Sequence, residues 1–247
     1  MKVYHIAYEP TWKSVDIHFW TSCNLSCRAC YANFEHLDFG LLDDPIAAIA
    51  SKSRQRPPDN FLSLSEVLSL LKGLPIERAI FMGTEASLDP ELPALAKLLH
   101  REFHCYNVLL SNGLKLTDNA DIDEVIFGIK AFSGRLHYEY TGVSNKRILD
   151  NFASLYGSGK KLQAETVLIP NFIDGGEIER VAAFIGTVSR NIPLRVDAYF
   201  PVSGNPWRPA EKDEVNKAAD LARKHLANVS CLTLDLKRTG DKSVRVF

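Results

Sequence analysis

The chain alternates between short segments rich in β-branched and aromatic residues and longer segments with apolar residues at helical spacing. This alternation is typical of strand–helix units, which build a parallel sheet with helices packed outside it. The pattern predicts about six such units. The expected strands are 15–20, 78–82, 107–110, 125–129, 163–169 and 194–199.

Two of the expected helices carry start signals. Ser63 and Glu66 have the spacing of a capping box, so a helix should begin after Ser63. Asp89 is the expected cap of the next helix, with Pro90 at its first position. Further helices are expected at 144–156, 177–189 and 209–226.

At 247 residues with 46% hydrophobic residues, the chain can bury a substantial core, and we expect one domain over residues 1–247. Residues 33–62 lack a clear period and are predicted to be an insertion or lid, with a short helix near 45–51. Residues 230–247 are predicted to be a C-terminal extension of two strands joined by a turn, covering one end of the sheet structure.

Three cysteines lie within eight residues, directly after the first expected strand. Cys23, Cys27 and Cys30 have the spacing C-x3-C-x2-C. Thiolates are soft ligands that suit zinc or iron–sulfur centres, and structural sites of either kind normally use four protein ligands. A four-iron, four-sulfur cluster held by only three thiolates keeps one iron open for another ligand. The position after a strand fits, because α/β folds place ligand sites at the carboxyl ends of strands.

Other interpretations of the cysteines remain open. A zinc site could be completed by His18, His36 or Cys105, although zinc sites usually pair their cysteines in two separate knuckles. The cysteines could also be inert core residues, but the loop around them is polar. Cys105 and Cys231 are isolated, so a second cluster is not expected.

The cysteine motif resembles that of the radical S-adenosylmethionine (SAM) superfamily. A strand end at 81–86 resembles the family's glycine-rich Gly-Glu segment, with one of the usual two glycines. The downstream half resembles glycyl-radical-enzyme activating enzymes, of which pyruvate formate-lyase activating enzyme is the familiar case. The matching segments are 109–113, 125–130, 140–145 and 167–170. The resemblance implies an α/β fold, a partial (β/α)6 barrel of the radical SAM type that is open along one side.

The resemblance also implies roles for individual residues. Cys23, Cys27 and Cys30 would bind a [4Fe-4S] cluster. The implied SAM contacts are Gly83, Thr84 and Glu85 toward the methionine amino group, Lys130 toward the carboxylate, and Ser111 and Asn112 near the ribose. Plainer explanations exist for three of these residues: Gly83 could serve only a tight turn, Lys130 could be a solvated charge, and Asn112 could belong to a turn with Gly113.

Three positions depart from the family pattern. Leu110 stands where relatives usually have an acidic residue, Gly128 where they have an aspartate, and Phe200 where they have a histidine. Cofactor binding is still expected, but the departures put the specific activating-enzyme role in question.

The expected function is therefore reductive cleavage of SAM to a 5′-deoxyadenosyl radical, with an electron from flavodoxin or ferredoxin, followed by hydrogen abstraction. The leading substrate is a glycine in a protein; the alternatives are a small molecule of cofactor or metabolite biosynthesis, or a metal-stabilised binding module without catalysis. No side chain is identified as catalytic. The net charge of −1 argues against nucleic-acid binding, and without a run of eighteen apolar residues or a signal peptide we expect a cytoplasmic protein away from membranes.

Overall fold

The structure is a computed structural model that describes residues 1–32, 41, 58–115, 120–202, 204–235 and 239–247. In these residues the strands form one 9-stranded sheet in the order β8-β7-β6-β5-β4-β3-β2-β1-β9. Strands β2 to β8 run parallel, and β1 is antiparallel to both β2 and β9. The bounds are β1 Val3–Glu9, β2 Ser14–Phe19, β3 Arg78–Gly83, β4 Tyr106–Ser111, β5 Glu124–Gly128, β6 Lys161–Leu168, β7 Leu194–Ala198, β8 Val229–Leu232 and β9 Val244–Arg245.

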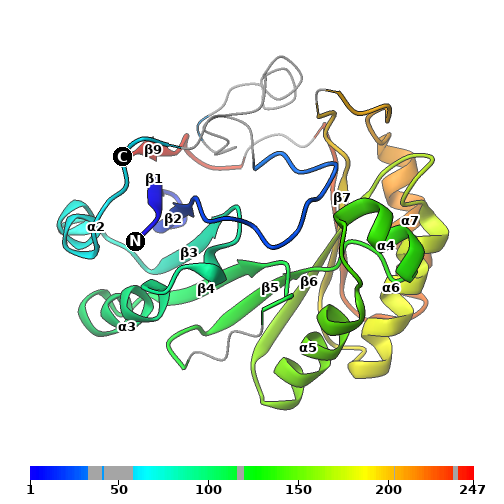
Figure 1. Ribbon diagram of the computed structural model, residues 1–247, viewed down its shortest axis with the longest axis horizontal. Coiled ribbons are helices and arrows are strands. Elements are labelled where there is room, and N and C mark those ends of the chain that lie inside the picture. Colours follow the sequence, from blue (N-terminus) through cyan, green and yellow to red (C-terminus); the bar gives the residue numbers. More distant parts are fainter. Residues whose placement is uncertain (33–40, 42–57, 116–119, 203, 236–238) are drawn as a thin grey trace.

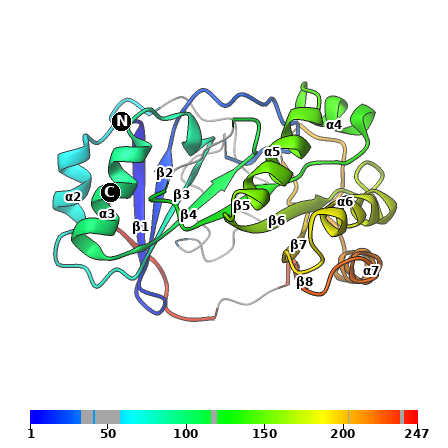
Figure 2. The same ribbon diagram turned by 90° about the horizontal axis from the view of Figure 1, so that it is seen from below.

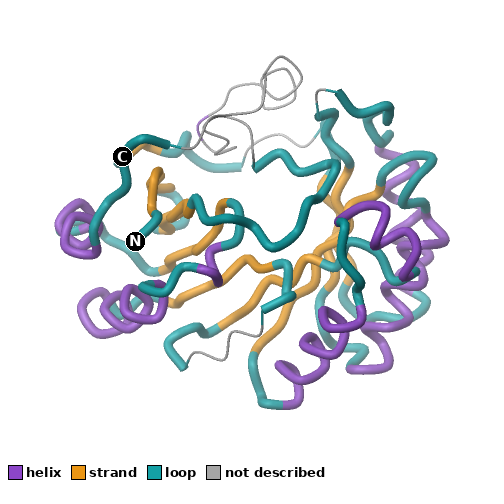
Figure 3. Tube along the Cα trace, viewed as in Figure 1, coloured by secondary structure: helices purple, strands orange, loops and turns teal. Residues whose placement is uncertain are grey.

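Helices cover the outer side of the curved sheet (Figure 1). They are α2 Leu64–Leu71, α3 Leu92–Phe103, α4 Gly134–Thr141, α5 Lys146–Gly157, α6 Gly175–Val188 and α7 Lys212–Arg223. Figure 2 shows the curvature from below, with β1 and β2 near one edge and β7 and β8 near the other, and Figure 3 separates helices from strands by colour. The fully buried Phe152 of α5 packs its ring edge-on against Phe127 of β5, 5.1 Å between centroids, so the outer face is held by apolar contact. The parallel sheet with outer helices confirms the pattern of the sequence, and the curved sheet is the α/β partial barrel that the resemblance implies.

All six expected strands are present as β2 to β7, each within about two residues of its expected bounds. Strand β1 was not expected. The two strands predicted in the C-terminal extension lie at opposite edges of the sheet, since β8 pairs with β7 and β9 pairs with β1. The expected short helix near 45–51 and most of the predicted lid lie outside the described residues.

The cap prediction is confirmed for one helix and wrong for another. Ser63 caps α2, and the capping box with Glu66 is complete. Asp89 instead ends a short 3-10 helix, η2 (Ala86–Leu88), while α3 begins later at Leu92. The Asp89 carboxylate accepts hydrogen bonds from the backbone N–H groups of Lys2 at 2.6 Å and Glu91 at 2.9 Å. The Asp89 side chain therefore binds Lys2, which is 87 positions away in the sequence, and no local pattern reveals this partner.

Helix α4 was also not predicted from the sequence.

Among the described helices, none combines the length and the apolar character needed to cross a membrane.

Candidate functional site

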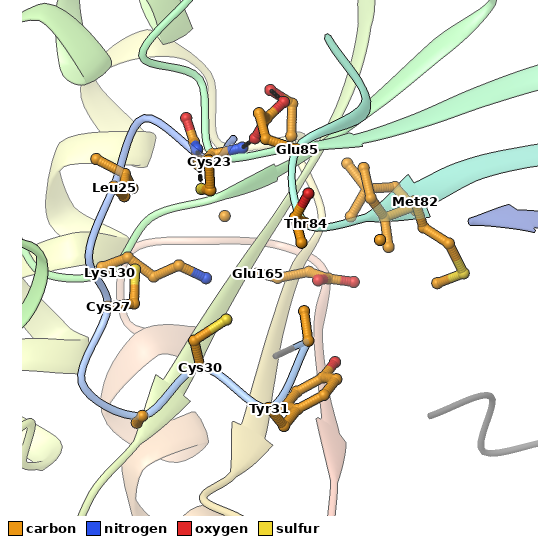
Figure 4. A pocket seen from close by; sticks show the side chains of 18 of the residues that line it. Cys23, Leu25, Cys27, Cys30, Tyr31, Met82, Thr84, Glu85, Lys130 and Glu165 are labelled. Atoms are coloured by element: carbon orange, nitrogen blue, oxygen red, sulfur yellow. Dashed lines mark hydrogen bonds between the residues drawn. The ribbon is translucent and has the colours of Figure 1, made fainter. Parts of the chain in front are cut away.

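A cavity of about 300 Å³ opens on the concave side of the sheet, at the carboxyl ends of the parallel strands. Figure 4 shows side chains that line it, from the loop after β2 and from β3 to β6. The lining includes every site residue that the sequence predicts, namely Cys23, Cys27, Cys30, Gly83, Thr84, Glu85, Ser111, Asn112 and Lys130. The structure thus gathers residues that are more than one hundred positions apart in the chain.

The cysteine loop is held in place by backbone hydrogen bonds to the end of α4. The N–H of Ser26 donates to the carbonyl of Thr141 at 2.8 Å, and the N–H of Arg28 donates to the carbonyl of Tyr140 at 2.9 Å. The guanidinium of Arg28 also lies over the ring of Trp207, 4.7 Å from its centroid. This cation–π contact ties the loop to the segment after β7.

The three thiols differ in their surroundings. Cys23 is exposed, whereas Cys27 and Cys30 are partly buried. Burial raises the pKa of Cys27 to about 12, against the opposing effect of the Lys130 charge. A soft metal centre at this loop would remove the proton, because it is the thiolate that binds metals.

Asn112 holds Cys23 from the end of β4. Its Nδ2 group donates to Asn24 Oδ1 at 2.8 Å and to Cys23 Sγ at 3.6 Å. The orientation of the amide is fixed, because its Oδ1 accepts the N–H of Leu114 at 2.9 Å. The Asn112 side chain, which the resemblance places near the ribose, thus stabilises the cysteine loop.

Gly83, at the end of β3, pairs with Phe19 at the end of β2. Its φ is +112°, and a Cβ added there would lie 2.2 Å from the carbonyl oxygen of Phe19. The next residue, Thr84, continues the contact: its N–H donates to Phe19 O at 3.0 Å, and its hydroxyl accepts the N–H of Thr21 at 2.9 Å. Glycine is therefore required both by the backbone conformation and by the close approach.

The carboxylate of Glu85 faces into the protein. It accepts hydrogen bonds from the hydroxyls of Ser87 at 2.6 Å and Ser111 at 2.9 Å, and from the N–H of Asn112 at 2.8 Å. Burial raises the pKa of Glu85, while these hydrogen bonds act in the opposite direction. Glu85 therefore joins the ends of β3 and β4.

Lys130 follows β5 and reaches into the space that the cysteines border (Figure 4). A Cβ added at Gly128 would lie 3.0 Å from Lys130 Nζ. The ammonium group thus occupies the space beside position 128. The turn after Lys130 is fixed by the buried Glu177, whose carboxylate accepts the N–H groups of Phe132 at 2.7 Å and Ser133 at 2.6 Å.

Several lining residues were missed by the sequence reasoning. They are Tyr4, Asp16, Tyr31, Met82 and Glu165, among others, while His18, a candidate zinc ligand in the sequence, also lines the cavity. Charged residues inside expected strands could have indicated the face of the sheet that borders the cavity. Glu165 in β6 is one, and Arg195 and Asp197 in the neighbouring β7 are two more. Side chains of a strand alternate between its two faces, so these charges share the face opposite the helices.

The donor set fits an iron–sulfur cluster better than one metal ion. Within the described residues, no three His, Cys, Asp or Glu side chains are placed to share a single ion. The three cysteines of a cubane cluster bind different irons, so their sulfurs need not meet at one point. Cys105, one proposed fourth zinc ligand, is buried elsewhere, with its Sγ 3.9 Å from the carbonyl of Ile76.

The fold and the site define a class of protein: a partial barrel with three cysteines in the loop after its first parallel strand. Residues 17–185 match the family model of the radical SAM superfamily, and the chain belongs to that superfamily. It is a radical SAM enzyme, and the family implies SAM and an iron–sulfur cluster as cofactors.

Several individual proteins are similar to this chain in sequence or in structure. The chain is 33% identical over 186 residues to a protein of Methanocaldococcus jannaschii that carries the provisional name glycyl-radical enzyme activating enzyme, covering 71% of this chain and 70% of that one. A domain of pyruvate-formate lyase-activating enzyme from Bacteroides vulgatus is similar in structure, with a TM-score of 0.53, 15% identity and coverage of 63% of this chain and 98% of that one. Streptococcus suis SuiB bound to S-adenosylmethionine has a TM-score of 0.61 at 16% identity, and the match covers 85% of this chain and 48% of SuiB.

The Gly83 contact gives the first prediction. Gly83→Ala should lower the free energy of unfolding by about 1–3 kcal/mol more than Gly73→Ala, because overpacking adds to the cost of a positive φ. Gly73 is the matched control, with φ +90° and no atom within 4 Å of an added Cβ. Urea unfolding of the two metal-free variants measures the difference. Equal losses would show that the contact with Phe19 can relax.

Proposed function

We propose that Cys23, Cys27 and Cys30 hold a [4Fe-4S] cluster whose open iron binds SAM, and that the enzyme abstracts hydrogen from a glycine of a partner protein. The observation that carries the proposal is the cysteine loop itself, which borders one cavity with Lys130 and the ends of β3 and β4. When bound, the cluster and SAM supply a 5′-deoxyadenosyl radical and methionine after transfer of one electron, for which flavodoxin or ferredoxin is the proposed donor.

The chain's own residues would orient the cofactor. The Lys130 ammonium is the proposed partner of the SAM carboxylate, because a charge-assisted hydrogen bond fixes that end of the molecule. The Gly83–Thr84–Glu85 segment offers backbone groups to the methionine amino group, since the Glu85 carboxylate is already engaged. Ser111 and Asn112 are the proposed neighbours of the ribose.

A protein substrate is supported by the similarity to the Methanocaldococcus jannaschii protein and by its name. The deoxyadenosyl radical would take a hydrogen atom from the glycine Cα, leaving 5′-deoxyadenosine and a glycyl radical. The protein's part is to position one C–H bond against the radical and to exclude water.

The cluster assignment predicts the behaviour of cysteine variants. Anaerobically reconstituted protein should bind about four irons and form 5′-deoxyadenosine when reduced with SAM present. Cys23→Ala should lose both properties, because it removes one of only three thiolates. The buried Cys105→Ala should keep both. Iron analysis and chromatography of the nucleoside measure them, and a full cluster in a variant lacking all three cysteines would contradict the assignment.

The Asn112 contact predicts the redox behaviour of the cluster. Asn112→Leu should lower the midpoint potential by about 20–60 mV, because a hydrogen bond to a ligand sulfur of about 0.5–1.5 kcal/mol stabilises the reduced cluster. Asn151→Leu is the control, since its amide donates to the carbonyl of Gly113 at 2.8 Å and supports the same turn without reaching a cysteine. Spectroelectrochemical titration measures both variants. Equal shifts would assign the effect to the turn.

The glycine assignment predicts where the hydrogen comes from. A mixture of octapeptides with 2,2-dideuterated glycine at a fixed central position should transfer deuterium to 5′-deoxyadenosine, as mass spectrometry of the nucleoside can show. Octapeptides with Cα-deuterated alanine at that position should not. If 5′-deoxyadenosine forms but carries no deuterium with any of the glycine peptides, the result would favour the small-molecule alternative.

A further inference from the structure

The cavity has a second half, which faces away from the cysteines. Glu165 extends from β6 into this half, on the side where Tyr31 and Met82 lie (Figure 4). Behind Glu165, on the same face of the sheet, Arg195 and Asp197 of β7 complete a set of charges. We name Glu165, Arg195 and Asp197 the β6–β7 ion network.

The β6–β7 ion network is tightly connected. Arg195 Nη2 lies 2.7 Å from Glu165 Oε1, and Arg195 Nε lies 2.7 Å from Asp197 Oδ1. A second bond, from Arg195 Nη2 to Asp197 Oδ2 at 3.0 Å, makes the contact with Asp197 bidentate. Arg195 thus makes two hydrogen bonds to Asp197, and its Nη2 group also forms the ion pair with Glu165.

The charges of the network do not balance. One guanidinium faces two carboxylates, and the Glu165 and Asp197 side chains are only 19% and 14% exposed. Burial and the neighbouring Asp197 raise the pKa of Glu165, while Arg195 and, more weakly, Lys130 lower it. Within the network, one guanidinium therefore only partly compensates two carboxylates that water screens poorly; the other cation that acts on Glu165 is Lys130, outside the network.

Stability alone explains the network poorly. Buried ion pairs are often no more stabilising than apolar residues of similar volume, because desolvation offsets the attraction. Val167, two positions after Glu165 on the same face of β6, shows that this wall also accepts an apolar side chain. A function for Glu165 is the better explanation.

We propose that Glu165, supported by Arg195 and Asp197, is a substrate anchor that binds an ammonium or guanidinium group. The anchor deepens the proposed function and rests on it. The side chain of a lysine or arginine next to the target glycine would enter the outer half of the cavity. The glycine itself would then lie in the half that the cysteines border. Lys130 also acts on Glu165, but where its ammonium group pairs with the SAM carboxylate it does not neutralise Glu165.

The test uses two glycine dipeptides that differ in one charge. The probes are N-acetyl-glycyl-lysine amide and N-acetyl-glycyl-norleucine amide, which has the same four-carbon side chain without the ammonium group. Each is titrated calorimetrically into iron-reconstituted protein with SAM and no reductant. The lysine probe should bind about tenfold or more tightly, because a hydrogen bond between charged partners contributes that much. Glu165→Gln should bring the ratio of the two dissociation constants close to one.

Two further variants separate binding from folding. Glu124→Gln is the matched control, because Glu124 is a buried carboxylate at the other end of β5, 3.2 Å from Lys161, and its loss should leave the ratio unchanged. Asp197→Asn frees Arg195 for Glu165 and should reduce the ratio even if Glu165→Gln folds poorly. A wild-type ratio near one, or a preference for lysine that persists in both anchor variants, would overturn the proposal.

The reaction itself is followed separately. Deuterium in the glycine of the same lysine probe reports hydrogen abstraction on addition of reductant. A charge preference in binding without deuterium transfer would support the anchor and count against glycine as the target, so the two ideas fail in different ways.

Discussion

The contact between Gly83 and Phe19 is the constraint on which the site depends. It brings the ends of β2 and β3 so close that a Cβ would meet the Phe19 carbonyl at 2.2 Å. The cysteine loop leaves from the end of β2, and the segment with Thr84 and Glu85 leaves from the end of β3. Because these two strand ends are joined, the loop starts at a fixed place beside the ends of β4 and β5.

The far end of the cysteine loop is fixed by different elements. Ser26 and Arg28 donate backbone hydrogen bonds to the last turn of α4, and Arg28 lies over Trp207. The loop thus spans from the β2–β3 side of the barrel to the side formed by α4 and the segment after β7. The position of the cysteine loop consequently depends on contacts from both sides of the barrel, including α4, which contributes no cysteine.

Much of this arrangement could be predicted from the sequence, because local signals encode it. Apolar periodicity located six strands, the Ser63–Glu66 spacing located a helix start, and the cysteine spacing located the loop. Strand β1 and helix α4 escaped prediction. Helix α4 ends at its cap residue Gly142, which has φ +77°. Its last carbonyls accept hydrogen bonds from the cysteine loop, and no local sequence pattern indicates this long-range contact. Asp89 failed as a cap for the same reason, since Lys2 is a partner far away in sequence.

The absence of a side chain at position 128 shapes the site. A Cβ added at Gly128 would lie 3.0 Å from Lys130 Nζ. A larger side chain there would compete with the lysine for space, so the glycine and the lysine conformation are coupled. Across the sheet, Gly128 pairs with Glu165, whose charge acts on the outer half of the cavity instead. The carboxylate at this level of the barrel thus belongs to β6, where it faces the proposed substrate rather than the proposed cofactor.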